Sequence, residues 1–199
     1  MRAFDPKTGH PFFQKRRRRY DETGHARELT FSCYRHFPFL GRDRTRKWFV
    51  ESLEAARRKW GFELWAYCLM PEHAHLLVHA NQKGLDFDRI VGTLKQEVAR
   101  KAIAHLEEHS PGWLARITVR EHNCIRRRFW QPGGGYDRNV VEIATVHTMV
   151  DYIHANPVRR KLVDLPEDWE WSSARWYAGI QPVRIEMDTT LPMLHPDGQ

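Results

Sequence analysis

The stretch Met70-Pro71-Glu72-His73-Ala74-His75-Leu76-Leu77-Val78 places two histidines, one residue apart, in front of an apolar run. Side chains alternate between the two faces of a strand, so we expect His73 and His75 to project from the same face, roughly 7 Å apart along the backbone. Two imidazoles at that spacing can bind one cation. The alternative is two half-buried histidines that form hydrogen bonds within a sheet, and the stretch alone slightly favours it.

The composition is that of a folded, basic protein. The 199 residues fit one domain, and a hydrophobic content of 41% with 8 tryptophans indicates a buried core. A formal net charge of +7 favours a polyanionic partner, with nucleic acid ahead of membrane. No apolar run reaches the roughly 18 residues of a membrane span, and no apolar signal segment opens the sequence. We therefore expect a cytoplasmic, nucleoid-associated protein.

The three cysteines, Cys33, Cys68 and Cys124, are scattered and form no CxxC pair. Such an arrangement is typical of reduced thiols, and it argues against disulfides and against a thiolate zinc site.

Apolar periodicity predicts six elements in the order strand, helix, strand, strand, helix, strand. We expect strands at residues 28–34, 62–70, 73–78 and 117–120, and helices at 43–60 and 87–106. This order is that of a split βαβ unit, so the expected fold class is α+β, a ferredoxin-like antiparallel sheet with helices on one face. A third helix is expected over 140–155, where Pro157 would stop it.

Three segments are expected along the chain. Residues 1–24, with their run of arginines, are typical of a basic arm, and residues 25–178 of one folded domain. Residues 179–199 contain Pro182, Pro192 and Pro196, which indicate a C-terminal tail.

Tyr152 and Asn156 stand four residues apart in the third helix, so they are expected on one helix face. An amide oxygen is a ligand that hard divalent cations accept. Together with His73 and His75 it would leave open positions on Mg²⁺ or Mn²⁺ for phosphate oxygens. A phenol one turn away could then attack a phosphorus atom, with the cation neutralising the developing charge.

Other side chains near these motifs are weaker candidates. His79 shares the strand face but lies farther along, as a secondary or substrate contact at best. His154 is expected to point away around the helix. Tyr136 lacks a ligand-type residue one turn away, and Asp151 fits an exposed helix position. Glu72 fits either a loop charge or a partner of a ligand.

Several of these motifs together resemble the HUH single-tyrosine transposases, in particular the branch associated with repetitive extragenic palindromes (REP). The resemblance covers roughly residues 15–178. It rests on Met70–His75 and on Val150–Val158, supported by the stretches Gly24–Phe31, Arg128–Gln131 and Trp169–Ala174.

The resemblance implies a ferredoxin-like catalytic core that cuts single-stranded DNA, often beside a hairpin. By that resemblance His73, His75 and Asn156 bind the metal and Tyr152 is the nucleophile. The attack would leave a 5′-phosphotyrosine and a free 3′-hydroxyl, which can be rejoined without ATP. A monomer is favoured for this branch, with a dimer as the alternative.

A single DNA strand requires a basic groove with aromatic platforms. The basic candidates for DNA contact are Arg16, Arg17, Arg18, Arg19, Lys95, Arg126, Arg127, Arg128, Arg159, Arg160 and Lys161. These charges also fit a domesticated hairpin-binding protein without required catalysis, which stays open as an alternative. A zinc hydrolase is disfavoured because no H-E-x-x-H helix is present.

Overall fold

The computed structural model describes residues 3–4, 11–12, 24–82, 84–121, 123–133 and 135–194. Arg16 to Arg19 of the expected basic arm lie outside the described residues. The short strands β1 (Ala3–Phe4) and β2 (Pro11–Phe12) pair with each other. Within the described residues, no helix combines the length and apolar character that crossing a membrane requires.

A four-stranded antiparallel sheet forms the centre of the molecule. Its strand order is β4-β5-β3-β8, with β3 (Ala26–Ser32), β4 (Glu63–Leu69), β5 (His73–His79) and β8 (Tyr136–Val140). In chain order this is the arrangement of a split βαβ unit, so the expected ferredoxin-like α+β fold is confirmed.

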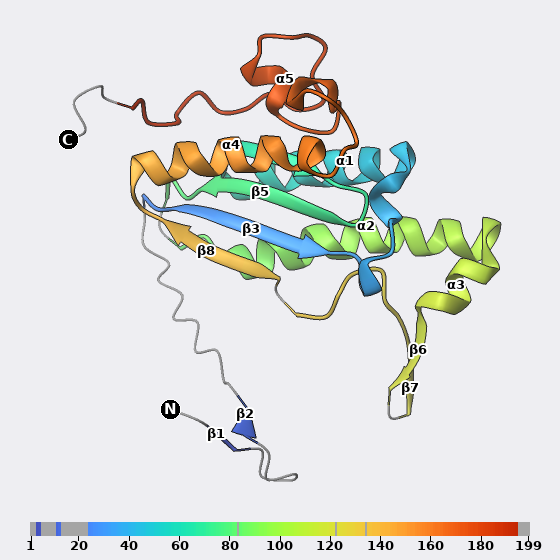
Figure 1. Cartoon of the computed structure of the whole chain (residues 1–199). Helices are drawn as coiled ribbons and strands as arrows, with labels where there is room; N and C mark the ends of the chain where they lie inside the picture. The colour runs from blue at the N-terminus through green and yellow to red at the C-terminus, as the bar shows by residue number, and fades with distance from the viewer. Residues whose placement is uncertain are drawn as a thin grey trace.

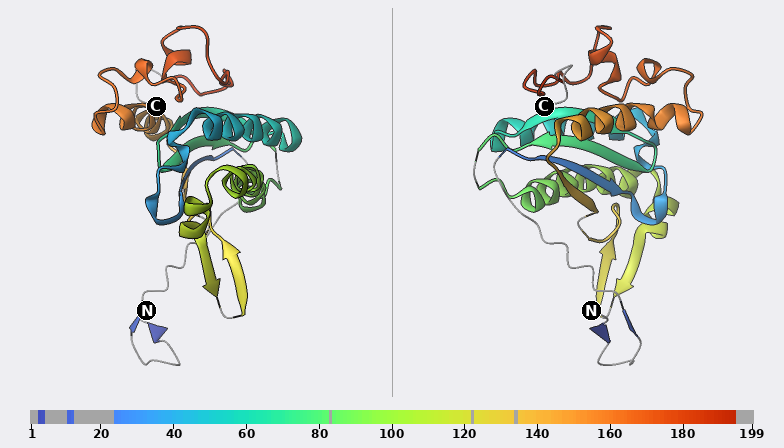
Figure 2. Two further views of the ribbon diagram at one scale, coloured as in Figure 1. Left: turned by 90° about the vertical axis from the view of Figure 1, so that its right-hand side faces the viewer. Right: turned by 60° about the vertical axis from the view of Figure 1, so that its left-hand side comes forward.

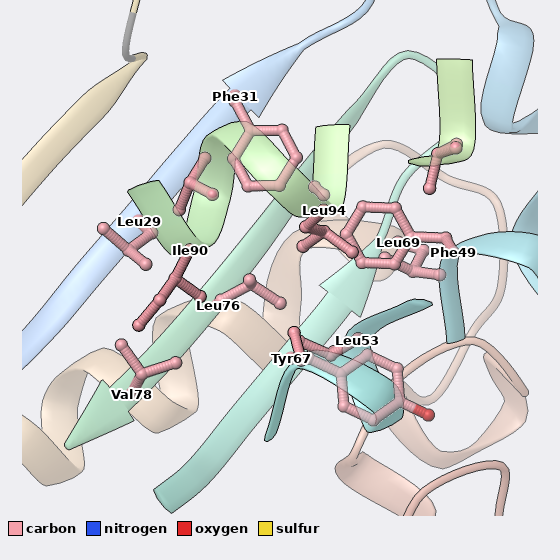
Figure 3. Packing of buried hydrophobic residues seen from close by; sticks show 14 of the residues in the cluster. Leu29, Phe31, Phe49, Leu53, Tyr67, Leu69, Leu76, Val78, Ile90 and Leu94 are labelled. Carbon is pink, nitrogen blue, oxygen red and sulfur yellow. The ribbon is translucent and has the colours of Figure 1, made fainter. Parts of the chain in front are cut away.

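Helices α1 (Asp43–Trp60) and α2 (Phe87–His109) cover one face of the sheet. Alternate residues of the strands point to this face, among them Leu29, Leu76 and Tyr67, and they pack against Phe49 and Leu94 from the helices. Figure 3 shows these side chains interlocking between strands and helices. Gly61 ends α1 in the left-handed conformation (φ 67°), as a glycine after a helix commonly does.

Helix α4 (Ile143–Arg159) covers the opposite face. Val146, Val150 and Ile153 pack on Ala66 and Leu77 from the other side of the strands. Figure 2 (left) shows the sheet between α4 on one side and α1 with α2 on the other. The sheet is therefore buried on both faces, which explains the near-continuous apolar run of β4.

The fourth strand of the sheet is β8, and the expectation of a fourth strand at 117–120 was wrong. Residues Pro111–Ile117 form the short helix α3, which begins at the proline because proline is tolerated in the first helical turn. Among the described residues, strands β6 (Thr118–Glu121) and β7 (Cys124–Arg127) pair with each other as a separate two-stranded sheet, and they project away from the main sheet (Figure 1). The β-forming residues were recognised correctly, but propensity does not reveal which partner a strand finds.

Pro157 does not stop α4, contrary to expectation, and the helix continues to Arg159. Proline removes one backbone donor and crowds the carbonyl four residues earlier. The side chain of Asn156 compensates for the missing donor, as described below.

The segment after α4 runs along the outer edge of β4. It contains the single turn Pro166–Asp168 and the short helix α5 (Ala174–Tyr177). The amide of Leu69 donates to the Trp171 carbonyl (2.9 Å), and that of Leu64 donates to the Asp188 carboxylate (2.7 Å). Ile185 and Met187, from the segment expected as a tail, are buried in the main core.

Candidate active site

His73 and His75 lie together at the beginning of β5, on the face of the sheet that α4 covers. Their Nε2 atoms are 2.9 Å apart, and the two rings meet edge to face. The strand geometry alone accounts for this pairing, since residues two apart share a face. Figure 1 places the start of β5, the end of β3 and the C-terminal end of α4 at the same end of the molecule.

Each imidazole is held by a partner on its other nitrogen. The Thr30 hydroxyl lies 2.9 Å from Nδ1 of His75, because Thr30 is the cross-strand neighbour of His75 on β3. The Glu72 carboxylate lies 3.1 Å from Nδ1 of His73 and also pairs with Arg160 at 3.1 Å. An Nδ1–H that donates to these oxygens would leave both Nε2 lone pairs facing one point.

Burial keeps both histidines neutral near pH 7. Burial first, and then the neighbouring His73, lower the pKa of His75 to about 3. Burial also lowers the pKa of His73, against the opposing effect of Glu72. Neutral imidazoles are the form that binds a metal, so both histidines have the ligand form near pH 7.

Helix α4 brings Tyr152 beside the histidine pair. The Tyr152 ring stands edge-on to the His75 ring, with 6.0 Å between their centroids, and the side chain is 39% exposed. The Arg159 guanidinium lies 5.2 Å from the centre of the same ring. The phenol therefore combines proximity to the histidines with access for a large substrate.

Asn156 is buried one turn after Tyr152, and its amide is oriented by the helix. Because Pro157 has no backbone N–H, the Ile153 carbonyl lacks its usual donor. Nδ2 of Asn156 donates to the Tyr152 carbonyl (2.8 Å) and to the Ile153 carbonyl (3.3 Å). Both hydrogen bonds of this side chain use the nitrogen, which leaves Oδ1 as the atom that can bind a ligand.

This donor set fits Mg²⁺ or Mn²⁺. Ligands at right angles around an octahedral ion with bonds of about 2.1 Å are about 3.0 Å apart, and the two Nε2 atoms are 2.9 Å apart. Across the described residues, no three His, Cys, Asp or Glu side chains gather as a metal site. Asn156, one turn after Tyr152, stays the predicted third ligand. All three cysteines are free, and burial raises the pKa of Cys33 and of Cys68 to about 12.

The sequence profile of the IS200-like transposases matches residues 25–156, which include the histidine pair, Tyr152 and Asn156. The chain belongs to the IS200-like transposase family. The chain is also similar to a Haemophilus influenzae protein named as a REP-associated tyrosine transposase. The two are 24% identical over 158 residues, which cover 76% of this chain and 85% of the relative.

A solved structure described as a REP-associated tyrosine transposase bound to a REP hairpin has the same fold. It matches 94% of the present chain and 98% of its own chain with a TM-score of 0.62, at 21% sequence identity. The family profile and these two relatives confirm the resemblance noted from the histidine and tyrosine motifs.

The basic residues of the transposase form two separate groups. Arg159 ends α4 with its guanidinium over the Tyr152 ring, and Arg160 and Lys161 follow directly, Arg160 being paired with Glu72. The second group lines a groove of about 810 Å³ between α2 on one side and β7 with the segment after it on the other, and consists of Lys95, Arg126, Arg127 and Arg128. Their binding to DNA remains a prediction.

The weaker candidates have other surroundings. His79 stacks on Trp65 and pairs with Glu63 (2.8 Å) at the far end of β5. His154 is buried, and its Nε2 lies 2.8 Å from the Ser173 hydroxyl; burial lowers its pKa to about 4. Tyr136 is the unexpected case, because it is the cross-strand neighbour of Thr30 and shares the face of His75.

Sequence reasoning missed Thr30 entirely and left the role of Glu72 open. Thr30 stands in a strand that was predicted correctly, but only the register of β3 against β5 places it opposite His75. No local pattern reports that register. For Glu72, its position directly before His73 was the available signal.

Proposed function

We propose that this transposase is a metal-dependent nuclease and strand transferase that acts on single-stranded DNA beside hairpins, with Tyr152 as the nucleophile. The observation that carries the proposal is the approach of the Tyr152 ring to His75, whose Nε2 faces that of His73 at 2.9 Å. Asn156 stands one turn along the same helix, and we propose it as the third ligand.

In the proposed reaction, the Tyr152 oxygen forms a bond to a backbone phosphorus and the bond from phosphorus to the 3′-oxygen breaks. The phenol proton leaves to solvent, the departing 3′-oxygen takes up a proton from solvent, and the products are a 5′-phosphotyrosine and a 3′-hydroxyl. Mg²⁺ or Mn²⁺, held by His73, His75 and Asn156, would polarise the phosphoryl oxygens. Because the phosphodiester energy is kept in the tyrosine ester, a 3′-hydroxyl can attack it and rejoin the strand.

Three features support DNA beside a hairpin as the substrate. The net charge is +7, and basic side chains lie both beside Tyr152 and along the groove under α2. The solved relative is described as bound to a REP hairpin. An exposed phenol suits a single strand, whose backbone can reach the tyrosine without a duplex to open.

The test is covalent trapping on single-stranded hairpin DNA with Mn²⁺, resolved on a denaturing gel. Wild type and Tyr136→Phe should form the adduct, whereas Tyr152→Phe should form none. Tyr136 is a demanding control because it shares the sheet face of His75. An adduct that survives Tyr152→Phe but is lost in Tyr136→Phe would reassign the nucleophile.

The same gel separates the transposase from a hairpin-binding protein that needs no catalysis. Adding EDTA should abolish the adduct while hairpin binding persists through the basic groups. Binding without any adduct in Mn²⁺ would favour the domesticated binder.

A further inference from the structure

An aromatic cavity of about 240 Å³ lies at the end of the sheet where the histidines lie, under the loop that follows β3. Its walls come from that loop, from the beginning of α1, from the end of α2 and from α3, and include Phe39, Trp48, Trp113 and Phe129. Its volume is below the roughly 300–1,000 Å³ of sites for drug-sized ligands, which suits a single ring system.

The walls of this cavity are arranged for stacking. Trp113 is 36% exposed, and its ring meets Phe37 and Phe39 edge-on at 5.5 and 5.6 Å. Arg116 lies 4.7 Å from the ring centre, but it lines an adjoining hollow and not the cavity. Trp113 therefore lines the cavity with a partly exposed ring, while Arg116 lies over that ring from the adjoining hollow.

The rim of the cavity is basic. Arg42 and Arg44 both line it and are exposed, and Arg44 lies 5.8 Å from the centre of the Trp48 ring. Aromatic faces beside arginines are the combination that binds unpaired bases and their phosphates.

The cavity is joined to the candidate active site through one loop. The Leu40 amide donates to the Pro71 carbonyl (2.8 Å), and the Cys33 amide donates to the Glu72 carbonyl (2.8 Å). Between them, Arg35 and His36 adopt left-handed backbone conformations (φ 52° and 53°) that side-chain-bearing residues rarely adopt. Such conformations persist where surrounding structure enforces them, often at functional sites.

We infer that the cavity binds one unpaired nucleobase of the DNA strand whose backbone passes over the Arg35–His36 turn from the histidine–tyrosine site. The base stacks on Trp113, and Arg42 and Arg44 contact the adjoining phosphates. This inference rests on the proposed function, because it takes single-stranded DNA beside a hairpin as the ligand. It adds a position at which the protein senses the strand outside the stem.

The experiment compares two DNA probes in EDTA at one fixed salt concentration: a hairpin with unpaired extensions on both sides, and the same stem without them. Fluorescence anisotropy measures Kd for wild type, Trp113→Ala, Trp113→Phe and the control Trp60→Ala. Trp60 is a half-buried tryptophan at the other end of α1. Trp113→Ala should weaken binding of the extended hairpin about tenfold, with no change for the bare stem, and Trp113→Phe should restore most of the loss.

Abasic units placed one at a time along the extensions then locate the base. At one position the abasic unit should weaken DNA binding by wild type about tenfold. It should not change the affinity of Trp113→Ala, because that variant already lacks the same contact. The base site would be overturned if wild type and Trp113→Ala bound the extended hairpin with equal affinity. It would also be overturned if Trp113→Ala lost the same factor of affinity for the extended hairpin and for the bare stem. A scan in which no position depends on Trp113 would overturn it as well.

The two proposals fail separately. Binding in EDTA does not require Tyr152 chemistry, so Tyr152→Phe should show the same abasic position as wild type. If wild type forms the adduct but no abasic position depends on Trp113, the proposed function stands and only the base site is rejected.

Discussion

At the residue scale, the candidate site depends on contacts behind the proposed metal ligands. Thr30 and Glu72 hold the two Nδ1 atoms, and the Asn156 nitrogen is occupied by its own helix. Each contact occupies one polar atom of the His73, His75 or Asn156 side chain and leaves the other polar atom to face the site. Partners of this kind orient metal-binding side chains and raise their affinity for the ion.

Replacing Thr30 by Val keeps the shape of the side chain and removes the oxygen that fixes His75. We expect the Mn²⁺ concentration for half-maximal adduct formation to rise about 10–100-fold, as is typical for loss of such a partner. Thr93→Val, which removes a hydroxyl bonded to the Arg89 carbonyl on α2, is the matched control. An unchanged Mn²⁺ requirement in Thr30→Val would show that the hydroxyl does not orient His75.

His154 makes stability depend on pH. Its folded pKa is about 4 against an ordinary value of 6.5, so between these values the unfolded chain binds the proton and the folded chain does not. Stability is therefore complete above pH 6.5 and falls as the pH drops, by about 1.4 kcal/mol per pH unit for this group.

The His154→Gln variant should show a shallower loss of unfolding free energy between pH 6.5 and 5 in urea titrations. His75, with a folded pKa of about 3, also lowers the unfolding free energy of the metal-free protein as the pH falls. Because wild type and His154→Gln both contain His75, this contribution is the same in the two proteins. Identical slopes for wild type and the variant would contradict the assignment.

At the scale of elements, α4 and the loop before β8 set the positions of the site. Helix α4 packs on the sheet through Val150 and Ile153, and its Tyr152 ring meets His75 near the start of β5. The loop reaches β3 at Thr30, where Gly135 has φ 79° and a Cβ would overlap the Thr30 carbonyl oxygen. This close approach requires glycine.

Gly135→Ala should therefore destabilise the protein by more than about 2 kcal/mol, since left-handed strain and steric overlap add. Gly133→Ala isolates the first effect, because Gly133 has φ 94° with open space around its Cβ position. We expect it to cost only about 1–2 kcal/mol. Thermal melting of both variants is the measurement, and equal losses would rule out the overlap at Thr30.

At the scale of the whole molecule, the C-terminal segment completes the fold. Ile185 and Met187 are buried, and Asp188 bonds the Leu64 amide and pairs with Arg57 at 2.7 Å. The segment thereby covers the outer edge of β4, which would otherwise offer unpaired backbone groups to a second chain. We propose on this ground that the protein is a monomer.

A chain that ends at Gly179 should lose about 3 kcal/mol or more of stability, because two buried apolar side chains are removed. It should also self-associate with rising concentration, through the uncovered edge of β4. A chain that ends at Pro192 is the control, since Met193 and Leu194 are 78% and 52% exposed. Melting curves and size-exclusion chromatography distinguish the two, and equal stability would contradict the role of the segment.

The sequence by itself determined the features that depend on local periodicity. A period of two placed His73 and His75 on one face, and a spacing of four placed Tyr152 and Asn156 on one side of a helix. The order of the first five sheet and helix elements followed from the same patterns.

Only the tertiary structure decided which distant residues meet. The fourth strand proved to be Tyr136–Val140 and not 117–120, and Thr30 reached His75 through the β3–β5 register. Pro157 stayed inside α4 because a neighbouring amide replaced its missing donor. Pairing and register depend on packing between segments far apart in the chain, and no short stretch of sequence carries that information.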